Sequence, residues 1–309
     1  MSYRTTEVEV RGGRLRVGVW ESPDLPQDKP ADHTVFAVHG VTSSHLAWAL
    51  VAERLVATPC TRLVAPDLRG RGRSADLPGP WGMEQHAEDL QALVGVFGRA
   101  DVTAGHSMGG FVVVVAAHRH PGTLGNLVLV DGGVPLPRPD GVPIETVLRT
   151  ILGPAAKRLA MTFADRDAYR RFWRAHPAFN GAWSPAVESY IDYDLVPGQD
   201  GWRSASRFDA VAEDSAQQGD GGSVQMAWEA MTDTPTFLRS PLGLLADPPG
   251  LYPPAALDNF AAAHPGFRWD DVENTNHYTL LLGPQGADCV STAITDHLDR
   301  LHESPLHSR

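Results

Sequence analysis

The stretch Gly105-His106-Ser107-Met108-Gly109 decides how this chain of 309 residues is interpreted. It has the form G-x-S-x-G, in which a serine sits on a sharp turn between a strand and a helix. A short strand-like segment precedes it at 101–104, and an apolar run of helix length follows it at 110–120. Small residues relieve backbone crowding at such a turn, and the amides of the following helix point at negative charge developing beside the serine. The pattern predicts a nucleophilic Ser107 rather than an incidental serine in a glycine turn.

The composition excludes several classes of protein. The formal net charge is −11 and the pI is near 5.6, which argues against nucleic-acid binding because that function favours a basic patch. The sequence has no Lys/Arg-rich run of the kind that binds a membrane surface. No run reaches the roughly 18 apolar residues that a membrane span requires. The N-terminal residues lack the apolar core of a signal peptide. We therefore expect a cytoplasmic protein that binds neither nucleic acid nor membrane; the sequence does not fix its oligomeric state.

Short apolar segments alternate with helical patterns along the chain. The first element is predicted to be a hairpin around Gly12-Gly13, because apolar and charged residues alternate on both sides of that turn. A helix is predicted over 83–97, where apolar residues recur at spacings of three and four. Further strands are predicted at 34–38, 63–65, 126–130, 235–238 and 267–272. This alternation predicts an α/β fold with a mostly parallel sheet and helices on both faces.

The segment 135–231 interrupts the alternation. It has no convincing buried strand, is rich in aromatic residues, and contains short helical pieces with start signals at Asp165 and at Ser184-Pro185. The stretch 217–222 has the composition of a flexible linker. We interpret 135–231 as a helical lid inserted into a core made of 1–134 and 232–309. Most of its aromatic residues are expected to form its own small core, and some to line a ligand pocket against the sheet.

Four motifs in one order resemble the α/β-hydrolase superfamily, and the resemblance covers nearly the whole chain. The loop His39-Gly40-Val41-Thr42-Ser43-Ser44 follows a buried strand, as the family's oxyanion loop does. The stretch at 67–74, DLRGRGRS, is similar to the family's D-x-R-G-x-G-x-S turn, the serine turn comes third, and NTNHY at 274–278 comes last. Within the superfamily the chain resembles the lid-bearing esterase, lactonase and C–C hydrolase branches. The resemblance implies an α/β-hydrolase fold with an inserted helical lid.

A serine hydroxyl needs a base that takes its proton. His277 lies in a polar loop before the C-terminal helix, which matches the position of the family's base. His106 adjoins the serine, but neighbours across such a turn point in different directions. His39 occupies the oxyanion loop, where the family uses it structurally, and His86 lies on an amphipathic helix, typical of a packing histidine. We therefore assign the base to His277.

The carboxylate that orients this base has two candidates. In most of the superfamily it follows the strand expected at 235–238, but Pro241-Leu242-Gly243-Leu244 contains no acid and Asp247 comes slightly later. In some branches it follows the strand at 126–130, where Asp131 stands before two glycines. We favour Asp131 over Asp247, with Asp270 or Asp271 as remote alternatives. The resemblance also implies an oxyanion hole formed by the backbone N–H groups of Val41 and Met108.

These residues predict a cofactor-free enzyme. The histidines and cysteines show no metal-ligand spacing, and the glycines at 70 and 72 lack the rest of a dinucleotide fingerprint. The leading hypothesis is a serine hydrolase that cleaves an uncharged, predominantly apolar small molecule, an ester or lactone, through an acyl-enzyme on Ser107. Two alternatives stay open. The same residues could serve C–C bond hydrolysis, thioester cleavage or perhydrolysis, or the fold could be a non-catalytic ligand receptor.

Overall fold

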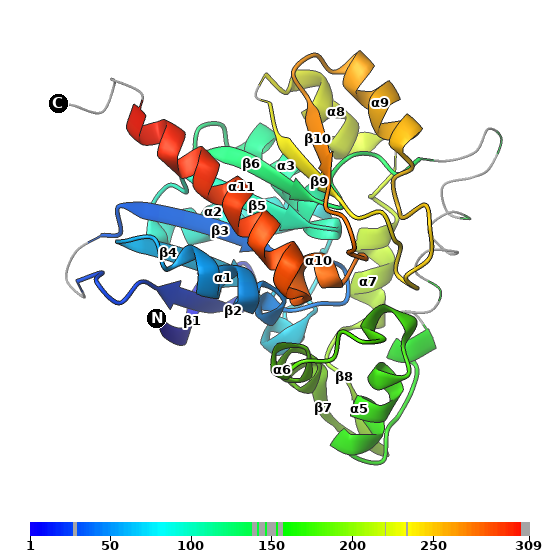
Figure 1. Ribbon diagram of the computed structural model, residues 1–309. Coiled ribbons are helices and arrows are strands. Elements are labelled where there is room, and N and C mark those ends of the chain that lie inside the picture. The colour runs from blue at the N-terminus through cyan, green and yellow to red at the C-terminus, as the bar shows by residue number, and fades with distance from the viewer. Residues whose placement is uncertain are drawn as a thin grey trace.

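An eight-stranded sheet forms the centre of the molecule. The computed structural model describes residues 1–26, 30–137, 141, 146, 153, 157–219, 221–232 and 234–303. The strand order is β1-β2-β4-β3-β5-β6-β9-β10, with β1, β2 and β4 paired antiparallel and the other neighbours parallel (Figure 1). The strands are β1 (Ser2–Val10), β2 (Gly13–Glu21), β3 (His33–Val38), β4 (Thr61–Pro66), β5 (Val102–His106), β6 (Asn126–Val130), β9 (Thr236–Arg239) and β10 (Arg268–Asp271). The predicted α/β class is confirmed, and each predicted strand has its counterpart.

Both faces of the central strands are buried, which explains why these strands show no polar alternation. All residues of β3 are buried. Phe36 and Val38 join the core on one face, whereas Val35 and Ala37 join the core on the other. Such continuous apolar runs are typical of parallel strands covered on both sides.

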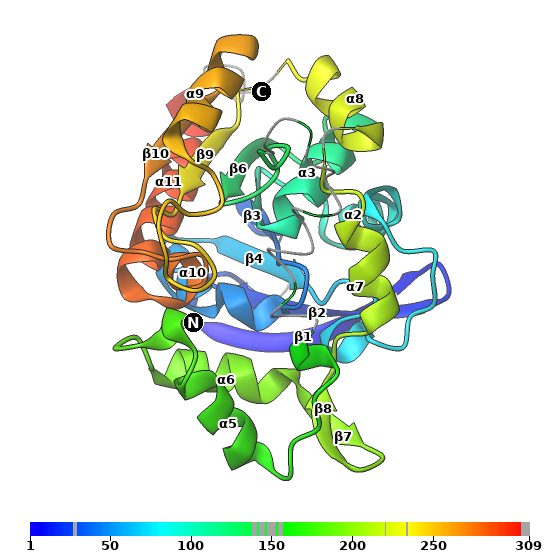
Figure 2. The same ribbon diagram turned by 90° about the vertical axis from the view of Figure 1, so that its right-hand side faces the viewer.

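Helices cover the two faces of the sheet in the way the alternation predicts (Figures 1 and 2). One face carries α2 (Met83–Phe97), α3 (Met108–Arg119), α8 (Gly222–Ala230) and α9 (Pro254–Ala263). The other carries α1 (Ala49–Leu55), α10 (Thr279–Leu282) and α11 (Pro284–Glu303). Single 3-10 turns stand at His45–Trp48, Gly72–Ser74 and Pro177–Phe179. The predicted helix over 83–97 coincides with α2.

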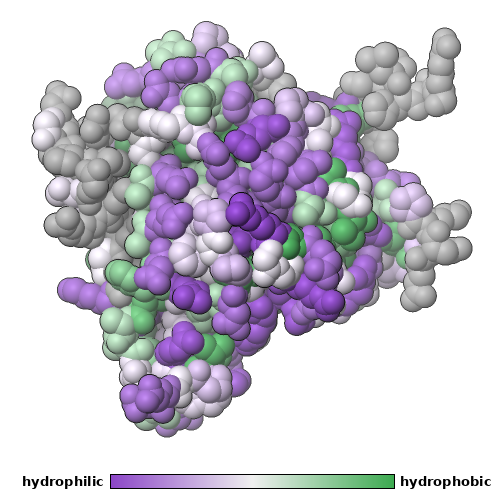
Figure 3. Space-filling view, turned by 180° about the vertical axis from the view of Figure 1, so that it is seen from behind, coloured by the Kyte–Doolittle hydropathy of each residue, from purple (hydrophilic) through white to green (hydrophobic). Residues whose placement is uncertain are grey.

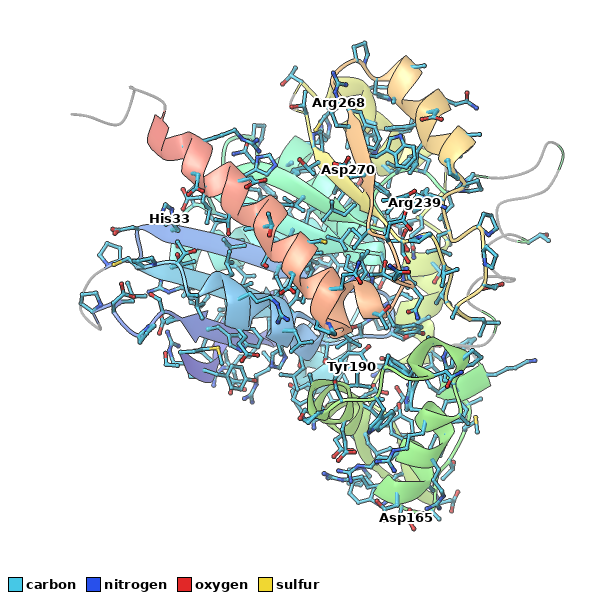
Figure 4. All side chains as sticks on the ribbon, viewed as in Figure 1. His33, Asp165, Tyr190, Arg239, Arg268 and Asp270 are labelled. Carbon is cyan, nitrogen blue, oxygen red and sulfur yellow. The ribbon has the colours of Figure 1, made fainter. Side chains whose placement is uncertain are left out.

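The described elements between β6 and β9 form a mostly helical layer beside the sheet. Its described elements are α5 (Arg166–Arg174), α6 (Pro185–Asp194), β7 (Leu195–Gly198), β8 (Gly201–Ser204) and α7 (Phe208–Ser215), followed by α8. The predicted start signals are confirmed: Asp165 accepts the N–H of Ala168 at 2.7 Å, and Ser184 accepts that of Val187 at 3.2 Å. Asp165 lies at the outer end of this layer, whereas Tyr190 of α6 lies where the layer meets the sheet (Figure 4).

Two features of this segment differ from the sequence interpretation. The strands β7 and β8 pair as a small antiparallel hairpin, which the sequence did not predict because neither strand is apolar throughout. The first part of the predicted linker at 217–222 is held in place, since the Gln217 side chain accepts the N–H of Met83 at 2.9 Å and Gln218 is buried. Helix α8 packs in the core with α3. The boundaries at 134 and 232, and the function of the segment as a lid, stay predictions.

The face opposite the view of Figure 1 is predominantly polar. Seen from behind, hydrophilic residues cover most of the molecule, and apolar residues form only small separate patches (Figure 3). Among the helices of the described ranges, none combines the length and apolarity that crossing a bilayer requires.

Candidate active site

Ser107 stands at the end of β5, directly before helix α3. Its backbone has φ of +54° and ψ of −124°, a left-handed conformation rare for a residue with a side chain. The turn is fixed by the Ser107 N–H, which donates to the Val130 carbonyl at 2.9 Å, and by the Ser107 carbonyl, which accepts from Gly110 at 2.9 Å. Ser107 is half-buried, and the turn places it at the wall of a pocket.

Glycines around Ser107 allow three backbone segments to meet. A Cβ atom on Gly109 would stand 2.1 Å from the Val38 carbonyl oxygen, and one on Gly132 would stand 2.1 Å from the Ser107 carbonyl oxygen. A Cβ on Gly40 would stand 3.1 Å from the Ser107 Cβ. The loop after β3 therefore lies directly against the serine, which agrees with the expectation that glycines accompany a close backbone approach.

His277 and Asp131 come from distant segments and meet beside this turn. The Nδ1 atom of His277 lies 2.7 Å from Oδ2 of Asp131, and both side chains are buried. A carboxylate only accepts hydrogen bonds, so Nδ1 carries the proton and Nε2 keeps its lone pair. The Asp131 backbone has φ of +47° and its N–H donates to Leu238 at 2.8 Å, which fixes the carboxylate at the end of β6.

The other acids proposed from the sequence lie elsewhere. Asp247 is exposed in a turn, where its carbonyl accepts the N–H of Gly243 at 2.8 Å. Asp271 forms an ion pair with Arg239, and both Asp270 and Asp271 are exposed on β10, beside β9 (Figure 4). The structure thus brings Asp131, and not these residues, to His277.

His106 supports the histidine loop from the neighbouring position of the turn. Its Nε2–H donates to the His277 carbonyl at 2.9 Å, and the two rings lie 4.6 Å apart. Burial, together with the adjacent His277, holds the pKa of His106 well below its usual range. His106 is therefore neutral and positions the backbone of His277. The sequence did not predict this contact, because it indicated only that His106 and Ser107 point in different directions.

His39 has the structural place that the resemblance implied. Its Nδ1–H donates to the Gly40 carbonyl at 2.7 Å, and its Nε2 accepts the N–H of Leu68 at 2.9 Å. Burial lowers the pKa of His39 to about 3. A neutral ring that both donates and accepts ties the loop after β3 to the loop after β4.

Arg71 holds the two residues proposed for the oxyanion hole. Its Nε–H donates to the Val41 carbonyl at 2.8 Å, and its side chain reaches within 3.9 Å of the Met108 sulfur. Met108 is the first residue of α3, so its N–H has no partner within the helix. Arg71 is fully buried and forms an ion pair with Asp214 of α7.

Asp214 receives a second partner from the core. His86 Nε2 lies 3.0 Å from its carboxylate. Burial opposes ionisation, but His86 and Arg71 hold the pKa of Asp214 below its usual range. His86 is thus a buried packing histidine, and the network connects α2, the loop 40–43 and α7.

Asp67, the first residue of the DLRGRGRS turn, connects α6 to the core. Its carboxylate accepts the Tyr193 hydroxyl at 2.7 Å, the His45 Nδ1–H at 2.7 Å and the Arg73 N–H at 2.8 Å. Burial works against the charge, but His45 and these hydrogen bonds lower the pKa of Asp67 to about 2. A fully buried carboxylate with this many donors fixes the neighbouring helical segment against the sheet.

The pocket at Ser107 is lined mostly by apolar side chains. The serine, His277 and Asp131 share it with the loop 40–43 and with Tyr190 of α6. The remaining lining residues are Ala47, His106, Phe111, Leu136, Gln218, Leu244, Leu251, Tyr252, Tyr278, Leu281 and Leu282. Among lining residues in the described ranges there is no lysine or arginine. Other aromatic residues of the segment pack together, since Phe163 and Trp173 each contact the rings of Tyr169 and Phe172.

Comparison with known proteins agrees with the fold. Residues 35–290 match the model of the alpha/beta hydrolase family. The chain belongs to the alpha/beta hydrolase family. Within this family it is 30% identical over 175 residues to an N-formylmaleamate deformylase of Pseudomonas putida, covering 53% of this chain and 64% of the relative. It is 31% identical over 169 residues to a monoacylglycerol lipase of Mycolicibacterium smegmatis, covering 52% of this chain and 58% of the relative.

A solved structure shares the fold over nearly the whole chain. The crystal structure of an E-2-(acetamidomethylene)succinate hydrolase superposes with a TM-score of 0.75 at 20% identity, covering 96% of this chain and 100% of the other. The curated relatives named above are matched over less than two thirds of their own lengths. The comparisons therefore establish the family and its fold, and the activity and substrate are separate questions.

Sequence reasoning missed several residues that the structure places at the site. Arg71 lies inside a motif that the sequence analysis noted, but its partner Asp214 is distant in sequence and carries no local signal. Gln218 was assigned to a linker. Its neighbours Gln217 and Gly219 gave the stretch a loop composition, and no periodic pattern marked it as buried.

Proposed function

We propose that the protein is a serine hydrolase that cleaves an uncharged, predominantly apolar ester or lactone through an acyl-enzyme on Ser107. The observation that carries the proposal is the hydrogen bond of 2.7 Å between His277 and Asp131 at the wall of the same pocket as Ser107. A histidine oriented by a buried carboxylate is the base that a serine nucleophile needs. No cofactor is required for this chemistry.

In the proposed reaction the Ser107 oxygen attacks the substrate carbonyl carbon while His277 Nε2 accepts the hydroxyl proton. Asp131 stabilises the resulting imidazolium and keeps the ring in the required tautomer. The N–H groups of Val41 and Met108 donate to the oxyanion, and each such donor contributes about 10²- to 10³-fold in rate. His277 then gives the proton to the leaving alcohol, and the acyl-enzyme remains. In the second half of the reaction a water molecule gives its proton to His277 and attacks the acyl-enzyme, which releases the acid and restores Ser107.

The pocket lining supports an uncharged substrate. A bound carboxylate is usually met by a charge-assisted hydrogen bond from arginine or lysine, and the described lining residues include neither. The buried arginines near the site are already paired, Arg71 with Asp214 and Arg158 with Asp194. We therefore do not extend to this chain the succinate or maleamate named for two of its relatives.

A graded panel of 4-nitrophenyl esters tests this proposal. We expect kcat/KM to rise by about ten-fold or more from acetate to medium-chain acyl groups, since each buried methylene contributes about 0.8 kcal/mol. A matched pair of acyl chains that end in a methyl ester or a free carboxylate should favour the methyl ester. A preference for small or anionic esters would refute the proposed substrate class, and turnover of a vinylogous diketone but of no ester would favour C–C hydrolysis instead.

A further inference from the structure

Gln218 is a buried polar residue of the pocket that the proposed chemistry does not use. It follows helix α7 and lines the same pocket as Ser107 and His277. The residue is only 4% exposed, and in the described part of the chain its Nε2 atom has no hydrogen-bond partner. Leaving such a donor buried without a partner is costly, so native proteins rarely do so without reason.

Hydrogen bonds hold the backbone that leads into Gln218. Its N–H donates to the Ser215 carbonyl at 3.3 Å, at the end of α7. The adjacent Gln217 accepts the N–H of Met83 at 2.9 Å, and Asp214 one turn earlier is paired with Arg71. The amide is therefore presented from a held segment, which favours directional recognition over simple space filling.

Among the three tyrosines of the described pocket lining, Tyr190, Tyr252 and Tyr278, the first two have engaged hydroxyls. The Tyr252 hydroxyl donates to the Val134 carbonyl at 2.7 Å, and the Tyr190 hydroxyl donates to the Ser43 oxygen at 3.1 Å. His277 donates to Asp131. The Gln218 Nε2 atom, with two N–H donors, has no partner among the described residues, and most of the side chains lining this pocket are apolar.

We infer that Gln218 is a specificity-determining residue that donates a hydrogen bond to a second, neutral oxygen of the substrate. The scissile carbonyl is accounted for by Ser107 and the proposed oxyanion hole, so the acceptor lies elsewhere on the substrate. A neutral amide matches a carbonyl, ether or hydroxyl oxygen. The substrate class narrows to apolar esters or lactones with one additional oxygen remote from the scissile bond. This inference rests on the proposed ester hydrolysis at Ser107.

Matched substrates and variants test the inference. One series compares 4-nitrophenyl heptanoate with analogues in which an ether oxygen replaces one methylene of the acyl chain. A second series makes the same replacement in the alcohol chain of hexyl butyrate. Each oxygen position gives a ratio of kcat/KM, oxygen-containing over all-carbon, for the wild type and for Gln218→Leu. Dividing the two ratios cancels the intrinsic reactivity of each ester.

In the wild type, at least one oxygen position should show a ratio about ten-fold or more above that of Gln218→Leu. Gln91→Leu is the matched control, because the Gln91 Oε1 atom is also buried without a partner but lies on α2 outside the pocket lining. It should leave every ratio unchanged. Gln218→Leu should unfold at or above the wild-type temperature, whereas a structural glutamine would lose stability.

Equal ratios for wild type and Gln218→Leu at every position in both series would overturn the inference. This result differs from failure of the proposed function, in which the wild type turns over no ester at all. In that case the same pairs are built as alkyl fluorophosphonates, and the rate of Ser107 labelling replaces turnover. Equal labelling ratios would again overturn the inference, and a ratio that depends on Gln218 would support it.

Discussion

Replacing Asp131 with asparagine removes one charge and almost no volume. Asp131 is fully buried, its Oδ2 accepts from His277 at 2.7 Å, and its Oδ1 lies 3.3 Å from the Ser240 N–H. An asparagine retains the size and can keep the contact with Ser240, so the fold should survive. It cannot stabilise the imidazolium, and its amide favours the wrong tautomer of His277. The equivalent change costs about 10⁴ in kcat in a well-studied serine protease, or about 5 kcal/mol of transition-state stabilisation.

Steady-state kinetics on the best ester from the graded panel measure this loss. Asp247→Asn is the matched control, because Asp247 is exposed in a turn, and it should stay within about two-fold of wild type. Circular dichroism of each variant establishes that the fold is retained. The reasoning is refuted if Asp131→Asn stays active while Asp247→Asn loses two or more orders of magnitude.

Two further predictions use the buried groups around the site. Asp214→Asn should lower kcat by about ten-fold with KM little changed, because Arg71 loses its charged partner and holds Val41 less firmly in the oxyanion loop; an unchanged kcat would contradict this positioning. Stability should fall as pH drops below about 6.5, because His39, with a pKa of about 3, and His106 stay neutral when folded but bind a proton when unfolded. Each of these two histidines lowers the free energy of unfolding by about 1.4 kcal/mol for each pH unit in this range. Urea unfolding that gives equal stability at pH 7 and pH 5 would contradict the assignment of both as neutral in the folded protein.

The sequence was sufficient for the sheet and for the turn at Ser107, because both depend on local patterns. Continuous apolar runs marked β3 and β6, and the glycines at 105 and 109 marked a turn where backbone segments meet. The choice between Asp131 and Asp247 could not be made in the same way. It depends on which strand end lies beside His277, and that follows from the pairing of β6 with β9, a contact between distant segments.

Long-range polar contacts account for most of what the sequence did not predict. The pairing of Arg71 with Asp214 crosses from the DLRGRGRS turn to α7, and neither residue has a periodic or motif signal for the other. The hairpin of β7 and β8 has mixed polarity, so its short strands resemble loop residues. The aromatic content predicted a segment whose rings pack together, but not which ring reaches the pocket. Tyr190 does so because α6 presents it to Ser43.

Mass spectrometry of the acyl-enzyme tests the central claim most directly. The wild-type protein is mixed with a slowly deacylating medium-chain 4-nitrophenyl ester, quenched in acid within the first turnover and digested. We expect the acyl group on the peptide that contains Ser107, together with a burst of one nitrophenolate per active site, and neither signal in Ser107→Ala. Steady turnover without an adduct on Ser107, or undiminished turnover by Ser107→Ala, would contradict an acyl-enzyme at this serine.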